Sequence, residues 1–184
     1  MESTELSKML RGELYNPEEL CSLRLRAQHL VKSYNESSPA EVLNRKRILA
    51  SLSEGGIKES ATVVPPFYCD YGFNLNIGEN CFINYNCVLL DCNQISLGNN
   101  VLLGPSVQIY TAEHPTDPQT RLSGLEFSKP VSIGENVWIG GGAIVLGGVC
   151  IGSNTTIGAG SVVTKNIPSN TVAVGNPCAV VKTL

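Results

Sequence analysis

The segment "YTAEHPTDP" carries the side chain best suited to acid–base chemistry in this chain. It places His114 at an interruption of an otherwise regular sequence, and His114 is one of only two histidines. An imidazole ordinarily titrates near pH 6.5, so at neutral pH it can take a proton from a hydroxyl group that attacks another molecule. The second histidine, His29, lies in a stretch with helical spacing and suggests no role.

The cysteines and histidines form no recognisable metal site or nucleophile. A catalytic zinc site needs a cluster of ligands such as several histidines. Beyond residue 57 the chain contains a single histidine, which argues against a zinc-dependent hydratase. No CxxC pair occurs, and no cysteine stands beside a base in the sequence. We therefore expect seven reduced thiols that pack as small apolar side chains: Cys21, Cys69, Cys81, Cys87, Cys92, Cys150 and Cys178.

Composition and charge exclude further classes of function. The 184 residues suit one domain, and their formal net charge of −3 does not indicate nucleic acid or an anionic membrane as a partner. The first twenty residues are charged and lack the apolar core of a signal peptide. No apolar run approaches the roughly 18 residues that a membrane-spanning helix needs. We expect a cytoplasmic protein with no nucleic-acid or membrane partner.

Aliphatic residues recur every six positions from about residue 62 onwards. In "VSIGENVWIGGGAIVLGGVCIG" they stand at positions 133, 139, 145 and 151, and glycine follows most of them. No helix has a six-residue period, whereas six residues accommodate one short strand and one turn. Three such units make a triangular coil, and stacked coils bring the aliphatic side chains into interior ladders. The same spacing includes Ile77, Ile83, Leu97, Leu103, Ile109, Ile157 and Val163.

Two irregularities interrupt this period. Ile83 and Leu97 are 14 positions apart, two more than two repeats, so we expect a bulge or turn near "LDCNQ". Ile109 and Ile133 are 24 positions apart, so the register survives an 18-residue excursion over residues 115–132. The excursion is rich in Pro, Thr, Ser and Asp, and long loops in compact proteins are commonly functional. The histidine described above immediately precedes it.

Residues 1–57 follow a different pattern, that of a helical segment. Asn16 is a predicted N-cap with Pro17 at the first helical position, and Ser38 in "SPAEVL" is a second predicted N-cap. A Gly-Gly pair ends the second helix, and residues 58–184 form the β-helix domain with a C-terminal tail. The basic residues of the helices are expected on solvated outer faces, namely Arg24, Arg26, Arg45, Lys46 and Arg47.

Several segments of the chain resemble the maltose and galactoside O-acetyltransferases, and most closely the maltose acetyltransferase branch. The helical part of the resemblance lies in "GELYNPEEL" and "RLRAQHLVKSYN", and the later part in "CDYGFNLNIGENCFINYN" and "KPVSIGENVWIGGGAIVLGGVCIG". The most specific segments are "YTAEHPTDP" and "IGAGSVVTKNIPSNTVAVGNPCAVV". The resemblance covers roughly residues 5–183. It implies a mainly β fold, a left-handed parallel β-helix of hexapeptide repeats, whereas general crossover rules favour the opposite hand.

The resemblance implies an acetyl-CoA-dependent O-acetyltransferase that moves an acetyl group to a sugar hydroxyl. His114 matches the family's general base, and the implied mechanism is direct transfer within a ternary complex. The matching acceptor-site residues include carboxylates and an amide, which bind hydroxyl groups well. The expected acceptor contacts are Asn84, Asp70, Glu126, Phe82 and, where the local spacing differs, Asn16. Maltose, glucose and simple galactosides all remain open as acceptors.

The same resemblance implies coenzyme A contacts along the edge of the β-helix. The backbone amide of Gly141 is the expected donor to the thioester oxygen. Lysines are the expected partners of the nucleotide phosphates, although Ala179 stands where branches of the family carry an arginine. The resemblance implies a homotrimer with sites between subunits, and no catalytic metal. The expected coenzyme A contacts are Trp138, Gly141, Ala159, Thr164, Lys165 and Lys182.

Two other functions remain open on the sequence alone. A xenobiotic acetyltransferase of the chloramphenicol type would use the same cosubstrate and base with a different acceptor pocket, and it usually lacks the helical N-terminal segment. A non-catalytic β-helix scaffold would not need a histidine beside a long loop, and it typically shows a regular array of Thr or Asn on one face. The outer positions of this chain are irregular.

Overall fold

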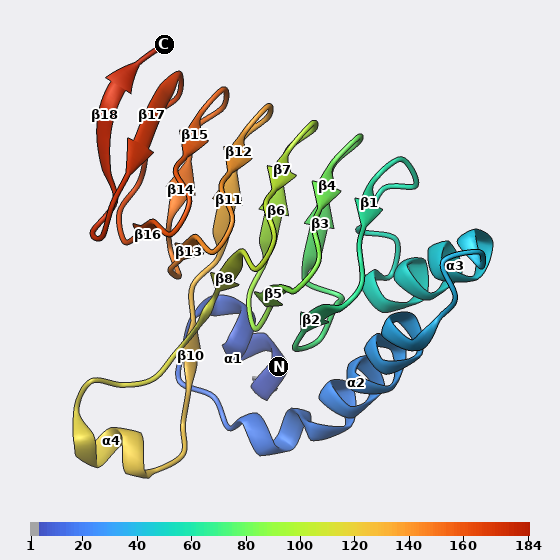
Figure 1. The fold of residues 1–184 in the computed structure, drawn as a ribbon. Helices are drawn as coiled ribbons and strands as arrows, with labels where there is room; N and C mark the ends of the chain where they lie inside the picture. The colour runs from blue at the N-terminus through green and yellow to red at the C-terminus, as the bar shows by residue number, and fades with distance from the viewer. Residues whose placement is uncertain (1–3) are drawn as a thin grey trace.

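The computed structural model describes residues 4–184, in which short strands stack into a triangular parallel β-helix with helices packed at its N-terminal end (Figure 1). Successive coils contribute strands to three sheets, called here the first, second and third face. The chain passes from the first face to the second and then to the third before it begins the next coil. This arrangement confirms the β-helix predicted from the six-residue period.

The first face is a seven-stranded sheet, parallel except for its last pair. The last two strands of this sheet pair antiparallel, and the last one is an edge strand that carries the C-terminal end of the described chain. In spatial order the strands are β1 (Thr62–Val63), β4 (Phe82–Ile83), β7 (Leu102–Leu103), β12 (Trp138–Ile139), β15 (Thr156–Ile157), β17 (Thr171–Val174) and β18 (Ala179–Thr183).

The second and third faces are shorter and wholly parallel. The second face consists of β2 (Phe67–Cys69), β5 (Cys87–Leu90), β8 (Gln108–Tyr110), β13 (Ile144–Val145) and β16 (Val162–Val163). The third face consists of β3 (Leu75–Ile77), β6 (Ile95–Leu97), β11 (Val131–Ile133) and β14 (Cys150–Ile151).

Residues at the predicted six-residue spacing form the interior ladders. On the first face, Ile83, Leu103, Ile139 and Ile157 lie in register in successive coils, and each is at most 1% exposed. Successive residues of a strand point to opposite sides of a sheet, so the residue before each of these points outward. The column of aliphatic contacts explains why the chain keeps so strict a period.

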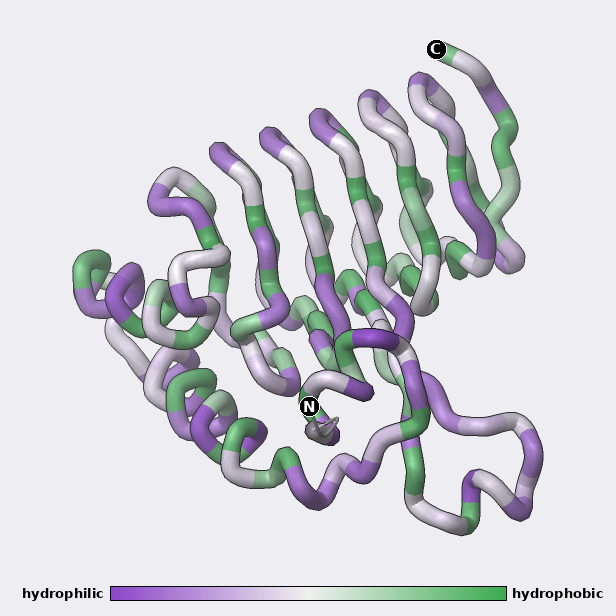
Figure 2. Tube along the Cα trace, turned by 180° about the vertical axis from the view of Figure 1, so that it is seen from behind, coloured by the Kyte–Doolittle hydropathy of each residue, from purple (hydrophilic) through white to green (hydrophobic). Residues whose placement is uncertain are grey.

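A row of asparagines occupies the corner between the third and first faces. Their backbones have φ between 56° and 59°, a left-handed conformation that asparagine tolerates better than most residues. From the second member onward, each side-chain amide donates to the side-chain oxygen in the next coil at 2.9–3.0 Å. The turns at this corner are hydrophilic in successive coils (Figure 2). The row consists of Asn80, Asn100, Asn136, Asn154 and Asn170, so the expectation that the outer positions are irregular is wrong at this corner.

The helices of residues 21–53 close the N-terminal end of the β-helix (Figure 1). Asn16 caps the short helix that leads into them, as predicted, because its side chain accepts a hydrogen bond from the Glu18 amide at 3.1 Å. Ala27 and Leu52 are fully buried in the same cluster as the interior ladders. Among residues 4–184, no helix has the length and apolar character needed to cross a membrane. The helical elements are α1 (Glu5–Arg11), η1 (Pro17–Leu20), α2 (Cys21–Glu36) and α3 (Val42–Ser53).

The start of the last of these helices differs from the prediction. α3 begins at Val42 after Glu41, not directly after Ser38. The Ser38 carbonyl accepts a hydrogen bond from the Glu41 amide at 2.9 Å, which closes a turn before the helix. The Ser38 hydroxyl faces the Ala40 amide at 3.4 Å inside that turn. The N-cap predicted at Ser38 is therefore wrong, since the local hydrogen bonds form a turn first.

The thiols are all free, but two of them are not core residues. Cys21 and Cys150 are exposed, and Cys69 is half-buried. Cys150 precedes the buried Ile151 in β14, so it points away from the interior. The expectation of apolar packing is therefore wrong for Cys21 and Cys150. It holds for the four buried thiols, those of Cys81, Cys87, Cys92 and Cys178.

The long excursion is an antiparallel hairpin that projects away from the β-helix (Figure 1). β9 (Ala112–Glu113) pairs with β10 (Phe127–Ser128), and α4 (Pro118–Leu122) lies beyond the pair. Asp117 caps α4 by accepting a hydrogen bond from the Thr120 amide at 2.7 Å. The hairpin thus begins at Ala112, three residues before the expected excursion over residues 115–132.

Candidate active site

His114 lies on the outgoing arm of the hairpin, directly after β9. Its side chain is exposed, and it forms no hydrogen bond or ion pair with other residues in the described range. An imidazole in this setting can take a proton from a molecule bound beside the hairpin. The fold therefore leaves the predicted base accessible and its ring nitrogens unengaged.

Glu126 lies on the returning arm of the hairpin, where the N-terminal segment holds it. The backbone groups of Tyr15 and Glu126 exchange two hydrogen bonds of 2.9 and 3.1 Å, and the Tyr15 hydroxyl donates to Glu126 Oε2 at 3.0 Å. Tyr15 is fully buried, and burial raises the pKa of its phenol, so the hydroxyl remains a donor. Tyr15, which the sequence did not single out, thus orients one of the predicted acceptor residues.

Asp70 lies close to Tyr15 and Glu126. The Cys92 thiol donates to Asp70 Oδ2 at 3.3 Å, and Arg24 Nε lies 3.8 Å from Asp70 Oδ1. Tyr15 interacts with the Cys92 thiol as well as with Glu126, which links the two carboxylates. We call Tyr15, Arg24, Asp70, Cys92 and Glu126 the acceptor-side cluster. It joins the N-terminal segment, α2, the first two coils and the hairpin.

The sequence suggested that Arg24 lies on a solvated outer face, but the structure places it against Tyr71 and Asp70. Its guanidinium carbon is 5.3 Å from the centre of the Tyr71 ring, and its Nη2 donates to the Tyr71 hydroxyl at 3.3 Å. Arg24 Nε is buried and has no hydrogen-bond partner in the described part of the chain. The expectation is wrong because the aromatic ring and Asp70 draw this side chain inward, and neither partner is adjacent in the sequence.

Asn16 adjoins the acceptor-side cluster but has a structural task of its own. Its side-chain oxygen caps η1, and its backbone amide donates to Glu5 Oε2 at 2.6 Å. The amide group of the side chain remains available as a donor. The acceptor contact expected of Asn16 stays a prediction.

A second group of predicted residues lies toward the corner between the first and second faces. Phe82 and Trp138 point outward in register with Leu102, and these three side chains are 38–55% exposed. Asn84 follows β4, and its side-chain oxygen accepts a hydrogen bond from the Tyr85 amide at 2.9 Å. The turn thus occupies the oxygen of Asn84 and leaves its NH₂ group as a donor beside an apolar strip.

Gly141 and Ala159 stack at the same corner in adjacent coils. The Gly160 amide donates to the Gly141 carbonyl at 3.0 Å. A Cβ atom on Gly140 would lie 2.5 Å from the Ala159 nitrogen, so the close approach of the coils requires glycine there. The Gly141 amide forms no hydrogen bond within residues 4–184 and is free to bind an oxygen atom.

The remaining residues expected to bind coenzyme A are spread further. Thr164 and Lys165 follow β16 at the corner between the second and third faces. Lys182 lies in β18 opposite Val172. All three predicted residues are exposed, and neither lysine forms an ion pair with the part of the chain that the structure describes.

The predicted base and the predicted thioester contact thus lie at opposite ends of the second face, and the predicted acceptor contacts are divided between the two ends. Asp70 and the hairpin that carries His114 follow strands of this face, whereas Asn84 and Gly141 precede them. The four residues of β5 alone span about 13 Å at roughly 3.3 Å per residue. One chain by itself does not bring the expected base and the expected thioester contact together.

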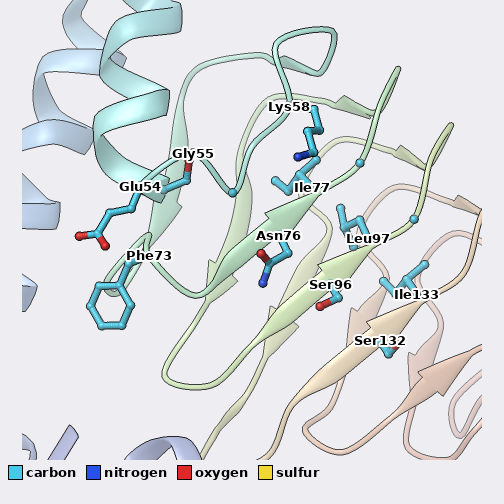
Figure 3. Close-up of a pocket in the computed structure, with 14 residues that line it drawn as sticks. Glu54, Gly55, Lys58, Phe73, Asn76, Ile77, Ser96, Leu97, Ser132 and Ile133 are labelled. Atoms are coloured by element: carbon cyan, nitrogen blue, oxygen red, sulfur yellow. The ribbon is translucent and has the colours of Figure 1, made fainter.

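A hollow on the third face is separate from both groups (Figure 3). It has a volume of about 760 Å³ and lies beside the end of α3. Asn76, Ser96 and Ser132 line it in register from β3, β6 and β11. Its lining includes none of the predicted site residues, so the hollow is not part of the candidate site.

Asn93 joins the N-terminal segment to the base of the hairpin. Its side-chain amide donates to the carbonyls of Met9 and Leu10 at 3.2 and 3.3 Å and to the Ser128 hydroxyl at 3.1 Å. The Ser128 hydroxyl in turn donates to the Met9 carbonyl at 2.7 Å. Asn93 is 4% exposed, so these groups depend on it rather than on water.

Replacing Asn93 by alanine should lower the free energy of unfolding by about 1–3 kcal/mol, because buried polar groups lose their partner. Amide hydrogen exchange in the hairpin should also rise, since its base loses an anchor. Denaturant unfolding measures the first effect. Asn44→Ala is the control, because Asn44 is exposed and, among the described residues, donates only to Glu41, the residue just before its own helix. An equal loss in both variants would contradict the anchoring role.

Two family models match this chain. The model described as the maltose acetyltransferase hexapeptide capping motif matches residues 8–52. The model described as bacterial transferase hexapeptide, with six repeats, matches residues 130–165. The first covers the helical segment and the second covers coils that carry Trp138, Gly141 and Ala159.

Individual proteins of known sequence or structure are similar over nearly the whole chain. Nodulation protein L of Rhizobium meliloti is 46% identical over 183 residues, which cover 98% of this chain and 99% of that protein. The crystal structure of a maltose O-acetyltransferase from Clostridium difficile is 49% identical, covers 98% of this chain and 97% of its own, and has a TM-score of 0.95. The structure of a galactoside acetyltransferase in complex with coenzyme A is 40% identical and has a TM-score of 0.91. The similarity covers 100% of this chain and 91% of that one.

Proposed function

Because this chain belongs to the hexapeptide-repeat family of maltose and galactoside O-acetyltransferases, we propose that it transfers the acetyl group of acetyl-CoA to a hydroxyl group of a sugar. It is an acetyltransferase of this type, with coenzyme A as the acetyl carrier. The observation that carries the proposed acceptor chemistry is the position of His114. This exposed, unengaged imidazole stands on the hairpin whose other arm holds an anchored carboxylate, that of Glu126.

His114 acts as the general base in the proposed reaction. Its imidazole takes the proton of the acceptor hydroxyl while the hydroxyl oxygen attacks the carbonyl carbon of the thioester. The Gly141 amide donates to the carbonyl oxygen as negative charge develops on it. The C–S bond then breaks, and the imidazolium returns its proton to the thiolate of coenzyme A. The acetyl group passes directly to the sugar, with no acyl-enzyme.

The acceptor is bound by side chains that accept and donate hydrogen bonds around an apolar wall. Asp70 and Glu126 accept from sugar hydroxyl groups, and the NH₂ group of Asn84 donates to the reacting hydroxyl. Phe82 offers its exposed ring to the face of the sugar. Asn16 adds a donor at the edge of the site. The anchoring of the two carboxylates supports this assignment, because an oriented carboxylate binds with a smaller loss of entropy.

Coenzyme A lies along the edge of the β-helix in this proposal. The Gly141 amide supports this placement, because it has no hydrogen-bond partner within residues 4–184 and can donate to a chain of amide groups that lies there. The exposed lysines supply positive charge for the phosphate groups. The proposed contacts are Trp138, Gly141, Ala159, Thr164, Lys165 and Lys182.

The active site is formed between neighbouring subunits of a homotrimer. This proposal rests on the separation of the two groups of residues, since the hairpin and the Asn84–Gly141 corner lie at opposite ends of one face. A neighbouring copy related by three-fold rotation can bring its own corner to the hairpin. The exposed strip of Phe82, Leu102 and Trp138 supplies apolar surface for such a contact.

A screen of acceptors with acetyl-CoA tests the proposed function. Release of free coenzyme A should exceed the no-acceptor rate with at least one of maltose, glucose or a simple galactoside, and mass spectrometry should find a product heavier by one acetyl group. Release with chloramphenicol but with no sugar would favour the xenobiotic alternative. No release with any acceptor would contradict an acetyltransferase of either kind.

A further inference from the structure

The irregular corner at "LDCNQ" contributes three consecutive buried side chains that bind residues outside the corner. Asp91, Cys92 and Asn93 are each at most 4% exposed. Asp91 binds the turn after β2, Cys92 binds the side chain of Asp70, and Asn93 binds α1 and the hairpin. The two extra residues between Ile83 and Leu97 therefore lengthen this corner, and its side chains hold neighbouring segments in place.

Asp91 holds the backbone on which Asp70 stands. Its carboxylate accepts hydrogen bonds from the amides of Asp70, Tyr71 and Asn74 at 3.0, 2.8 and 3.3 Å. The Asn74 side chain also donates to the Asp91 carbonyl at 2.8 Å. The backbone position of Asp70 is therefore fixed, and only its side-chain rotation remains to be set.

The Cys92 thiol sets that rotation. It is 1% exposed, and burial raises its pKa, so it keeps its proton and donates to Asp70 Oδ2 at 3.3 Å. Arg24 Nε lies 3.8 Å from Oδ1, beyond hydrogen-bond distance, and has no other partner in the described chain. The thiol is thus the side chain that forms a direct hydrogen bond to this carboxylate, and Oδ1 is left to accept one from a ligand.

We propose that Cys92 is a positioning residue of the acceptor site, which orients Asp70 so that Oδ1 accepts a hydrogen bond from an acceptor hydroxyl group. This inference rests on the proposed function, because it assigns the acceptor to the cluster. Cys92 itself touches neither the acceptor nor coenzyme A, and its thiol takes no part in acetyl transfer. The effect of Cys92 on acceptor binding passes mainly through Asp70, since its other contact, with the Tyr15 hydroxyl, leaves the hydrogen bond of Tyr15 to Glu126 in place.

Cys92→Ala should raise the KM for the sugar acceptor about 10-fold, the effect of losing one hydrogen bond to a charged group. The kcat should change less than about 3-fold and the KM for acetyl-CoA should stay unchanged, since base and thioester contacts are intact. Cys92→Ser should restore most of the acceptor KM, because a hydroxyl donates to a carboxylate as well. Steady-state kinetics with both substrates varied measures these values.

Cys87→Ala is the matched control. Cys87 is also fully buried, but its thiol donates to the backbone carbonyl of Gly104 at 3.3 Å within a regular coil. This variant should lose stability to a similar degree and keep the acceptor KM of the unaltered protein. An equal rise in acceptor KM for both alanine variants would overturn the positioning role and assign the effect to loss of packing.

A double-mutant cycle separates action through Asp70 from independent action. Asp70→Asn should raise the acceptor KM by itself, and adding Cys92→Ala in that background should raise it less than about 2-fold further. Effects that multiply would overturn the inference. If the unaltered protein acetylates a sugar and Cys92→Ala has the same acceptor KM, the positioning role of Cys92 is wrong but the proposed function stands. If the unaltered protein acetylates no sugar, both the proposed function and the positioning role are wrong.

Discussion

Replacing His114 by alanine should lower kcat for sugar acetylation by about 100-fold or more, because no other group removes the hydroxyl proton during attack. The KM values should change little, since the imidazole contributes mainly in the transition state. No hydrogen bond of His114 to a described residue is lost in the variant, so its thermal stability should match that of the unaltered protein. Initial rates at saturating acetyl-CoA and sugar give the comparison.

His29→Ala is the control for this experiment. His29 is also exposed, but it lies in α2 and no part of the proposed site includes it. The control should keep the kcat of the unaltered protein. If His114→Ala also kept its kcat, the proposed mechanism would be wrong whatever the identity of the acceptor.

Mixing two impaired variants should raise activity above that of either variant if the site is shared between subunits. His114→Ala removes the base, and Asn84→Ala should lower kcat about 10-fold to 100-fold by removing a donor to the reacting hydroxyl. When both variants are co-expressed in equal amounts, about a quarter of the sites should combine an intact His114 with an intact Asn84 from the neighbour. The mixed assemblies should therefore have about a quarter of the activity of the unaltered protein.

Co-expression of unaltered protein with the double variant is the matched control. A shared site predicts about a quarter of full activity in this mixture as well, whereas a site within one chain predicts about half. A site within one chain also predicts that the two single variants do not rescue each other. That pair of results would contradict the proposed placement of the site between subunits, and size measurement by light scattering would show whether trimers form.

The β-helix was predictable because its period is a local property with a global consequence. Ile139 and Ile157 are 18 positions apart in the sequence, which is three repeats and one coil, and they lie in register. The same regularity made the irregularity at "LDCNQ" visible in the sequence. It did not show what the extra residues contact. The cap predicted at Ser38 failed where two hydrogen-bonding patterns competed over a few residues, since that choice depends on small energy differences.

The candidate site was predictable only in part. His114 stood out because it lies where the period is interrupted, and the resemblance supplied the other predicted residues. Tyr15, Arg24 and Cys92 gave no such signal, since tyrosine and cysteine are common in cores and arginine is common on the outer faces of helices. Their importance appears only when Glu126 and Asp70 lie against them.

The repeat determines the β-helix from the chain alone, because every six residues restate the same strand, turn and inward side chain. The acceptor-side cluster could be found only in the folded molecule. Tyr15 meets Glu126 across 111 positions of sequence, and Cys92 meets Asp70 across 22. Neither contact follows from a period, because Tyr15 and Glu126 both lie outside the repeat and Cys92 lies at its irregular corner. The separation of His114 from Gly141 is likewise a property of the corners they occupy, which the spacing of residues along the chain does not reveal.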